Sequence, residues 1–221
     1  DLYNSKQDFG VHSDSVWDLP EPLLLRTIIV SEALVPYDTV TVEVRSETIQ
    51  RPVSRERGEL LRALVSMKIT PPLSTLPNFN SSNLSHIVFT FANLQHARLQ
   101  NSYIHEARFI HADLKYADLR YTILDSVYFV GGELRYTKLR NSSLNRTVFY
   151  MTDLRGADLR GADLSFTNLY GAKTDSTTKI SSTANYSVNI AHPGSDVPDS
   201  LVNLLSYAAK IGVKIDTVIK R

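Results

Sequence analysis

The chain has 221 residues, which is enough for one domain with flanking segments, and its composition is that of an ordinary folded protein. Its formal net charge is +1, so it is not a strongly acidic protein. It contains no Cys, which excludes disulfides and thiolate chemistry, and no apolar run approaches the ~18 residues of a membrane span.

Residues 1–76 are expected to form an N-terminal flanking and capping segment. Residues 1–19 are polar and are interpreted as an arm that lies on the surface or is frayed. A helix is predicted near Leu23–Leu34, because prolines stand on either side of it. Alternating valines predict a strand over Val40–Val44, and Arg51–Ser54 are expected to be a linker.

A second helix is predicted over residues 55–67, with Ser54 as its N-cap. Its apolar face is made of Leu60, Leu61, Leu64 and Val65. Such a face is suited to covering the open end of a repeat array, which would otherwise expose strand edges and core.

Residues 77–172 contain a five-residue repeat. A large apolar residue recurs at every fifth position from Phe79 to Leu169, and a small or β-branched residue usually stands two places before it. A period of five fits neither a helix nor a strand, so the chain must turn a corner every five residues. We call each five-residue unit a pentad and name it by its central apolar residue.

A second period of 20 residues predicts the shape of the coil. Half of the eight Phe residues stand 20 apart, at Phe89, Phe109, Phe129 and Phe149. If four pentads make one square coil, these rings form one core stack, because strands stack roughly 4.8 Å apart. The repeats then make between four and five coils with four walls, which we name the Phe, Leu114, Leu119 and Leu124 walls.

The runs ADLKYADLRY and DLRGADLRGADLSFTNLYGA resemble the pentapeptide repeat family, whose consensus is A(D/N)LXX. The resemblance implies an all-β solenoid, a right-handed quadrilateral β-helix. Residues 51–69 are also similar to the segment that leads into the repeats of some bacterial membrane-tethered members. That similarity implies the soluble part of such a protein, with a tether outside this sequence and an unknown location.

Residues 173–221 depart from the repeat pattern. Residues 173–195 are rich in Ser, Thr, Asn and Gly, and are expected to be a polar loop or tail. A helix is predicted over residues 199–211, where it would cover the C-terminal end of the stack or form a dimer contact.

Two walls carry columns of charge. On the Leu114 wall, Asp113, Glu133 and Asp153 run beside Lys115, Arg135 and Arg155, and the Leu119 wall carries Arg120, Arg140 and Arg160. Mutual neutralisation is the favoured interpretation, because exposed ion pairs contribute about 0–1 kcal/mol each. On the polar Leu124 wall, His86 is expected to stack on Glu106 and His105 on Asp125, and surface hydrogen bonding is favoured over a metal site.

The Phe wall is apolar outside as well as inside. Its candidate interaction residues are Val88, Phe91, Ile110, Tyr128, Val130, Val148, Tyr150, Met151 and Tyr170. Monomeric proteins rarely expose such a patch. The sequence leaves two covers open: the chain's own residues 1–50 or 173–195, or another molecule, which would be a protein partner or a second copy in a homodimer.

The sequence predicts a non-catalytic structural module that presents rigid walls to a protein partner. No HExxH, P-loop, GxGxxG or GxSxG motif occurs, so no catalytic residue, cofactor or metal is expected. The resemblance implies one alternative, because quinolone-resistance members mimic DNA and bind gyrase. That mimicry needs a strongly negative surface, whereas residues 79–172 hold ten Lys and Arg against eight Asp and Glu. Direct nucleic-acid binding is not expected either, because carboxylates are interleaved with the arginines.

Overall fold

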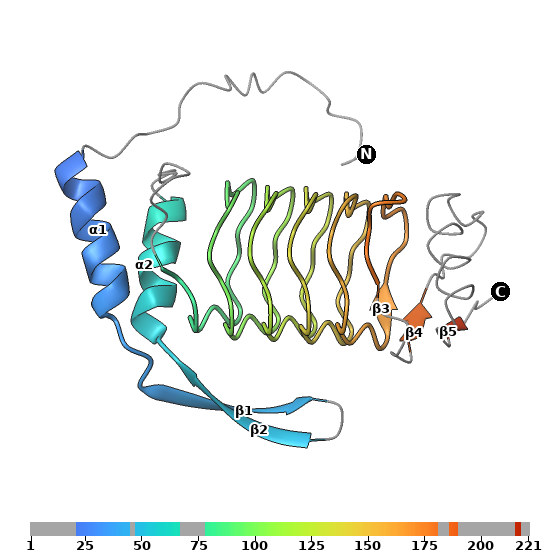
Figure 1. Cartoon of the computed structure of the whole chain (residues 1–221), viewed down its shortest axis with the longest axis horizontal. Coiled ribbons are helices and arrows are strands. Elements are labelled where there is room, and N and C mark those ends of the chain that lie inside the picture. The colour runs from blue at the N-terminus through green and yellow to red at the C-terminus, as the bar shows by residue number, and fades with distance from the viewer. Residues whose placement is uncertain (1–20, 45–46, 67–77, 181–185, 190–214, 218–221) are drawn as a thin grey trace.

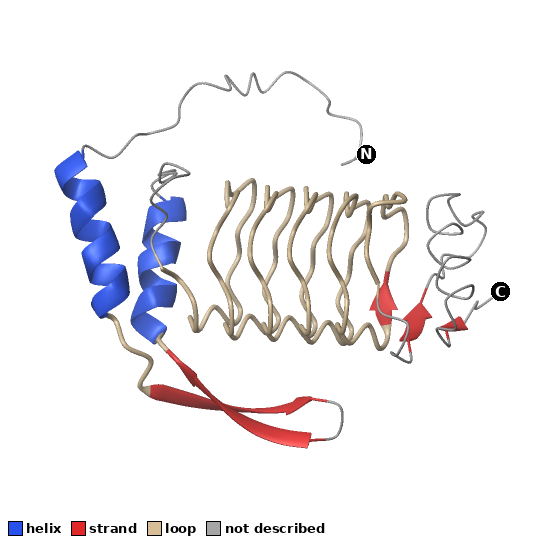
Figure 2. Ribbon diagram, in the orientation of Figure 1, coloured by secondary structure: helices blue, strands red, loops and turns tan. Residues whose placement is uncertain are grey.

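The computed structural model describes residues 21–44, 47–66, 78–180, 186–189 and 215–217. The chain forms helix α1 (Glu21–Ala33), the antiparallel hairpin of β1 (Asp38–Val44) and β2 (Glu47–Val53), and helix α2 (Arg55–Ser66). A stack of coils then runs away from α2, as Figures 1 and 2 show. The short strands β3 (Thr167–Asn168), β4 (Tyr186–Asn189) and β5 (Ile215–Thr217) follow at its far end.

Each pentad turns the chain through one corner. The corner residue, two places after the central one, has a left-handed backbone in all 19 pentads, 15 times as a non-glycine residue and four times as Gly. The turn closes with a backbone hydrogen bond such as that from Ala97 N to Leu94 O, at 3.1 Å. A residue with positive φ at this place is what a tight four-residue turn needs.

Parallel bridges join residues that are 20 apart along the whole stack. They run from Asn78↔Arg98 to Asp153↔Lys173 and always involve the residue before a central one. Around one bridge, Tyr103 N donates to Ser82 O at 2.9 Å and Leu84 N donates to Tyr103 O at 2.8 Å. The predicted coil of 20 residues is therefore confirmed.

The four phenylalanines form one stack in the core. The ring centroids of Phe89 and Phe109 lie 5.5 Å apart, those of Phe109 and Phe129 5.1 Å, and those of Phe129 and Phe149 5.2 Å. All four side chains are at most 2% exposed. The common spacing of 20 residues therefore places like side chains directly above one another.

The small position of each pentad accepts Ser and Thr because their hydroxyls find carbonyl partners inside the stack. Thr137 Oγ1 donates to Leu114 O at 2.8 Å, and Thr147 Oγ1 donates to Leu124 O at 2.7 Å. Each of these bonds spans 23 residues and joins one coil to the preceding one. A buried hydroxyl without a partner would be costly, so this pairing explains why polar residues alternate with Ala there.

Helix α2 packs on the first coil. Its Leu61 and Leu64 are buried in the same cluster as the coil core. Ser54 caps the helix, since Arg57 N donates to Ser54 Oγ at 3.1 Å. Ser54 also bridges to Ser82, and Asn83 N donates to Ser54 O at 2.9 Å. The prediction that residues 51–54 are a linker is therefore wrong, because they end β2 and join the ladder.

Helix α1 and the hairpin are attached to the outside of the stack. Ser31 of α1 accepts from Arg57 Nε through its carbonyl, at 2.9 Å, and from Asn78 N through its hydroxyl, at 3.0 Å. Arg51 of β2 donates to the carbonyl of Tyr121, at the corner between the Leu119 and Leu124 walls. Figure 1 shows the hairpin running alongside the stack on this side.

The coils continue beyond Ala172, where the predicted repeat domain ends. Lys179 bridges to Asp158, a spacing of 21 residues, and Ile180 is 8% exposed in the core cluster. The extra residue lies in a turn in which Thr178 N donates to Asp175 O at 3.1 Å. Residues 173–180 are therefore part of the stack and not a loop, which corrects the boundary. Strand β4 pairs with β3 and β5 with β4, all in parallel, whereas the predicted helix 199–211 lies outside the described residues.

Candidate interaction wall

The Phe wall presents an apolar outer surface over five coils. Four of its side chains are strongly exposed: Val88 by 57%, Phe91 by 75%, Tyr128 by 44% and Met151 by 52%. The other predicted members are half-buried, and they are Ile110, Val130, Val148, Tyr150 and Tyr170. The structure thus brings all nine predicted residues onto one side of the stack, because their pentads are in register.

Rings on the Phe wall pack against the rings of the next coil. Phe91 and His111 stack with centroids 5.2 Å apart, and Tyr150 and Tyr170 stack at 5.4 Å. Gly131 follows His111 in the same corner column, and a Cβ built there would lie 2.5 Å from His111 Nδ1. The Phe wall therefore carries stacked rings, and at its edge the ring of His111 lies over Gly131, where a Cβ would clash.

The described flanking segments leave this wall open. The hairpin meets the stack at the Tyr121 corner, which is half a coil away from the Gly131 corner at the edge of the Phe wall. Residues 173–180 lie in the stack, and β4 extends the ladder next to Asn168. Neither of the expected internal covers, as far as the structure describes them, lies over the wall.

The Phe wall carries positive charge only. Its fifteen outward positions all lie within residues 88–171, and they include Arg108 and His111 but no Asp or Glu. Both basic side chains are exposed, and Arg108 forms no ion pair with the described residues. This separates the Phe wall from the adjacent Leu114 wall, where Lys115 and Arg155 are paired with carboxylates.

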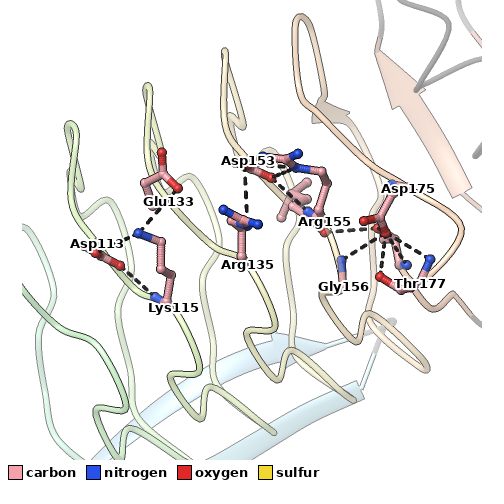
Figure 3. A network of polar contacts seen from close by, with 11 residues as sticks. Asp113, Lys115, Glu133, Arg135, Asp153, Arg155, Gly156, Asp175 and Thr177 are labelled. Carbon is pink, nitrogen blue, oxygen red and sulfur yellow. Dashed lines mark hydrogen bonds and ion pairs between the residues drawn. The ribbon is translucent and has the colours of Figure 1, made fainter.

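Most charges in the columns of the Leu114 and Leu119 walls are paired with an opposite charge, whereas Arg140 forms no ion pair with the described residues. Figure 3 shows Arg155 bound to Asp153, and Lys115 between Asp113 and Glu133 at 3.1 and 3.7 Å. Arg120 binds Asp118 through two nitrogens, at 2.8 and 2.7 Å. Partial burial is the largest single effect and raises the pKa of these aspartates. The side-chain and backbone hydrogen bonds from the adjacent Arg, together with its charge, outweigh it, so the pKa of Asp118, Asp153 and Asp158 is lowered.

The Leu124 wall holds hydrogen-bonded polar groups. Glu106 contacts both His86 Nδ1 and His105 Nε2 at 3.2 Å. Asp125 accepts from Ser143 Oγ at 2.6 Å and from Asn145 N at 3.1 Å. Burial raises the pKa of Asp125, and the nearby Asp163 also raises it. Within the described part of the chain, no group of three His, Asp or Glu side chains is arranged to hold a metal ion.

An aromatic column that was not predicted from the sequence lies at the corner between the Leu114 and Leu119 walls. His96 stacks on Tyr116 at 4.8 Å, and Tyr116 stacks on Tyr136 at 5.2 Å. The spacing of 20 residues between these rings is the feature of the sequence that could have revealed the column. The column ends at Gly156, which has no side chain. Because each ring covers the face of the next, the column presents ring edges to solvent.

The repeats match a known family. The family described as pentapeptide repeats matches residues 78–109, 107–146 and 138–173, with eight copies. Proteins of this family fold as right-handed quadrilateral β-helices, and they are in general protein-interaction modules. No curated protein sequence matches the chain significantly. Neither described helix has the length and apolar character that a bilayer span needs.

Solved structures of similar proteins include Rfr23 from the cyanobacterium Cyanothece 51142, with 24% identity and a TM-score of 0.25 over 47% of this chain and 87% of that one. HetL from Nostoc sp. strain PCC 7120, involved in heterocyst differentiation regulation, has 25% identity and a TM-score of 0.22 over 60% and 63%. QnrB1, a plasmid-mediated fluoroquinolone resistance protein, has 17% identity and a TM-score of 0.28 over 62% and 81%.

Proposed function

Because residues 78–173 are pentapeptide repeats, we propose that this protein is a non-catalytic interaction module that binds a protein partner through its Phe wall. The observation that carries this proposal is the exposed apolar surface of Val88, Phe91, Tyr128 and Met151. Large apolar patches on proteins usually mark binding sites. The Phe wall also has the aromatic, Met and Arg side chains that are enriched in the centre of protein interfaces.

The other walls support this choice by contrast. On the Leu114 and Leu119 walls, Asp118, Asp153 and Asp158 already occupy the guanidinium groups of Arg120, Arg155 and Arg160. A partner that bound there would have to replace these charge-assisted bonds, which are stronger than bonds between neutral groups. On the Phe wall, Arg108 forms no ion pair with the described residues that a partner would have to replace.

Gyrase binding by DNA mimicry, which the resemblance of the repeats to quinolone-resistance members implies, is the less favoured function. A DNA mimic needs a dense negative surface. Here the aspartates of two walls are neutralised by adjacent Arg and Lys, and the Phe wall carries no carboxylate. A supercoiling assay with purified gyrase would overturn this ranking if the protein protected the enzyme from a quinolone.

The proposal can be tested by placing charge on the wall with Val130→Asp and Val148→Asp. Both positions tolerate Asp in the repeat, because Asp125 and Asp153 stand at the same places of their pentads. The matched control is Asn101→Asp with Asn141→Asp, which adds the same charge at two exposed corner residues near the hairpin. Circular dichroism would check that each variant remains folded.

Self-association is measured by light scattering of the purified protein. Binding of a partner is measured by affinity capture from a lysate of the organism that naturally makes the protein, followed by quantitative mass spectrometry. We expect the wall variant to lose a partner, or to change from a dimer to a folded monomer, while the control behaves as the wild type. If the wild type, wall variant and control have the same mass and capture the same proteins, the Phe wall is not a binding surface.

A further inference from the structure

We propose that the Phe wall binds residues 1–19 of this chain, which an external partner would then have to displace. The inference rests on the proposed function, since both require the Phe wall to be a binding surface, but it names the occupant. Residues 1–19 lie outside the described residues, and they are favoured by their sequence, by the chemistry of the wall and by the position at which α1 begins.

The wall requires an occupant that is apolar and negatively charged. Its exposed side chains are large and apolar, and its only basic residues, Arg108 and His111, have no carboxylate beside them on the wall. Burying an apolar surface is favourable by about 25 cal/mol per Å². A desolvated Arg without a partner would oppose that burial, so the occupant needs an acidic group for Arg108.

Residues 1–19 have this chemistry. They contain four Asp and one Lys, a net charge of −3, together with three aromatic residues, Tyr3, Phe9 and Trp17. No other segment outside the described residues is acidic. Residues 190–214 contain two Asp and two Lys, and the segments 45–46, 67–77 and 218–221 contain basic residues but no acidic ones. Charge complementarity therefore favours the N-terminal segment.

The position of α1 favours the same occupant. Figure 1 shows α1 beyond α2, at the end of the stack, with its first turn level with the side of the stack that faces away from the hairpin. The hairpin contacts the Tyr121 corner, and the diagonally opposite corner, ten residues along the coil, is the column that contains His111 and Gly131. The first turn of α1 therefore lies on the side of the stack where the Phe wall has one of its two edges, the column of His111 and Gly131.

The segment is also long enough. Nineteen residues in an extended conformation span up to about 60 Å. The Phe wall from Val88 to Asn168 covers four coil steps, or about 19 Å at the spacing of stacked strands. A chain that leaves α1 can therefore cross the end of the stack and still lie along the whole wall.

Trp17 makes the proposal directly testable, because it is the only Trp in the chain. The experiment measures Trp emission and its quenching by acrylamide, a neutral quencher, in the full chain. If residues 1–19 bind the wall, the emission is blue-shifted and quenching is reduced relative to the urea-unfolded chain. Arg108→Glu, and Val130→Asp with Val148→Asp, should each abolish this protection, whereas Asn101→Asp with Asn141→Asp should retain it.

Several outcomes of these measurements would contradict the proposal. If Trp17 is quenched as readily in the folded chain as in urea, or if its protection survives both wall variants, the proposal is wrong. If light scattering gives a dimer whose protection disappears on dilution, the occupant is a second copy and not the same chain. If Trp17 is unprotected while the wall variant still loses its external partner, this inference fails and the proposed function stands.

Discussion

Replacing Phe129 by Ala should strongly destabilise the stack. Phe129 is 0% exposed and lies between two rings, with centroids 5.1 Å from Phe109 and 5.2 Å from Phe149. Burying roughly 150 Å² of ring surface contributes about 4 kcal/mol at about 25 cal/mol per Å². The two ring contacts contribute about 0.5–1.5 kcal/mol each, so we expect a loss of about 5–7 kcal/mol. The loss of free energy of unfolding is measured by urea titration followed by circular dichroism.

Two other Phe→Ala variants provide the controls. Phe89 has one ring neighbour, Phe109, at 5.5 Å, so its replacement should cost about 1 kcal/mol less than that of Phe129. Phe91 is 75% exposed, and its replacement should cost less than about 1 kcal/mol. The reasoning is refuted if Phe129→Ala costs under about 1 kcal/mol, or if Phe91→Ala costs as much as Phe129→Ala.

Three further variants test polar groups. Thr137→Val leaves the carbonyl of Leu114 without its hydroxyl donor and should lower the free energy of unfolding by about 1 kcal/mol; an unchanged urea midpoint would contradict this. The pKa of Asp153 is lowered in the folded state, so its stabilising effect is present above the unfolded-state pKa and is lost as pH falls through the folded-state pKa. Asp153→Asn should therefore cost about 1–2 kcal/mol at neutral pH and little in strong acid, and an equal loss at both pH values would argue against it. The pKa of Asp125 is raised, so its ionisation opposes folding as pH rises through the folded-state pKa, and Asp125→Asn should raise the melting temperature at neutral pH but not in acid.

The sequence predicts the stack well because one period controls both packing and register. The 20-residue spacing of the four Phe residues places them in one column, and the same register brings Arg135 within 4.0 Å of Asp153 in the next coil. These contacts are local in the coil and need no knowledge of the flanking segments. The nine residues of the Phe wall follow from the same register, although their binding role stays a proposal.

Features that break the period could not be predicted in the same way. One extra residue in the Asp175 turn hides the continuation of the stack to Ile180. The contact of Arg51 with the Tyr121 carbonyl joins residues 70 apart, and nothing in the local pattern of β2 indicates where the hairpin lies. The burial of Asp125 likewise depends on how neighbouring coils and segments surround it, so its raised pKa has no signal in the sequence.

The ladder of bridges has a consequence for how the chain folds. Most bridges in the stack join residues only 20 apart, which is about 0.1 of the chain length and within the range of helical bundles. A β structure usually folds slowly because its pairings close long loops, but here each new coil adds to the preceding one at the same small entropic cost. We expect folding to start at the Phe stack and to spread coil by coil in both directions. The tertiary structure would then form quickly for a β protein.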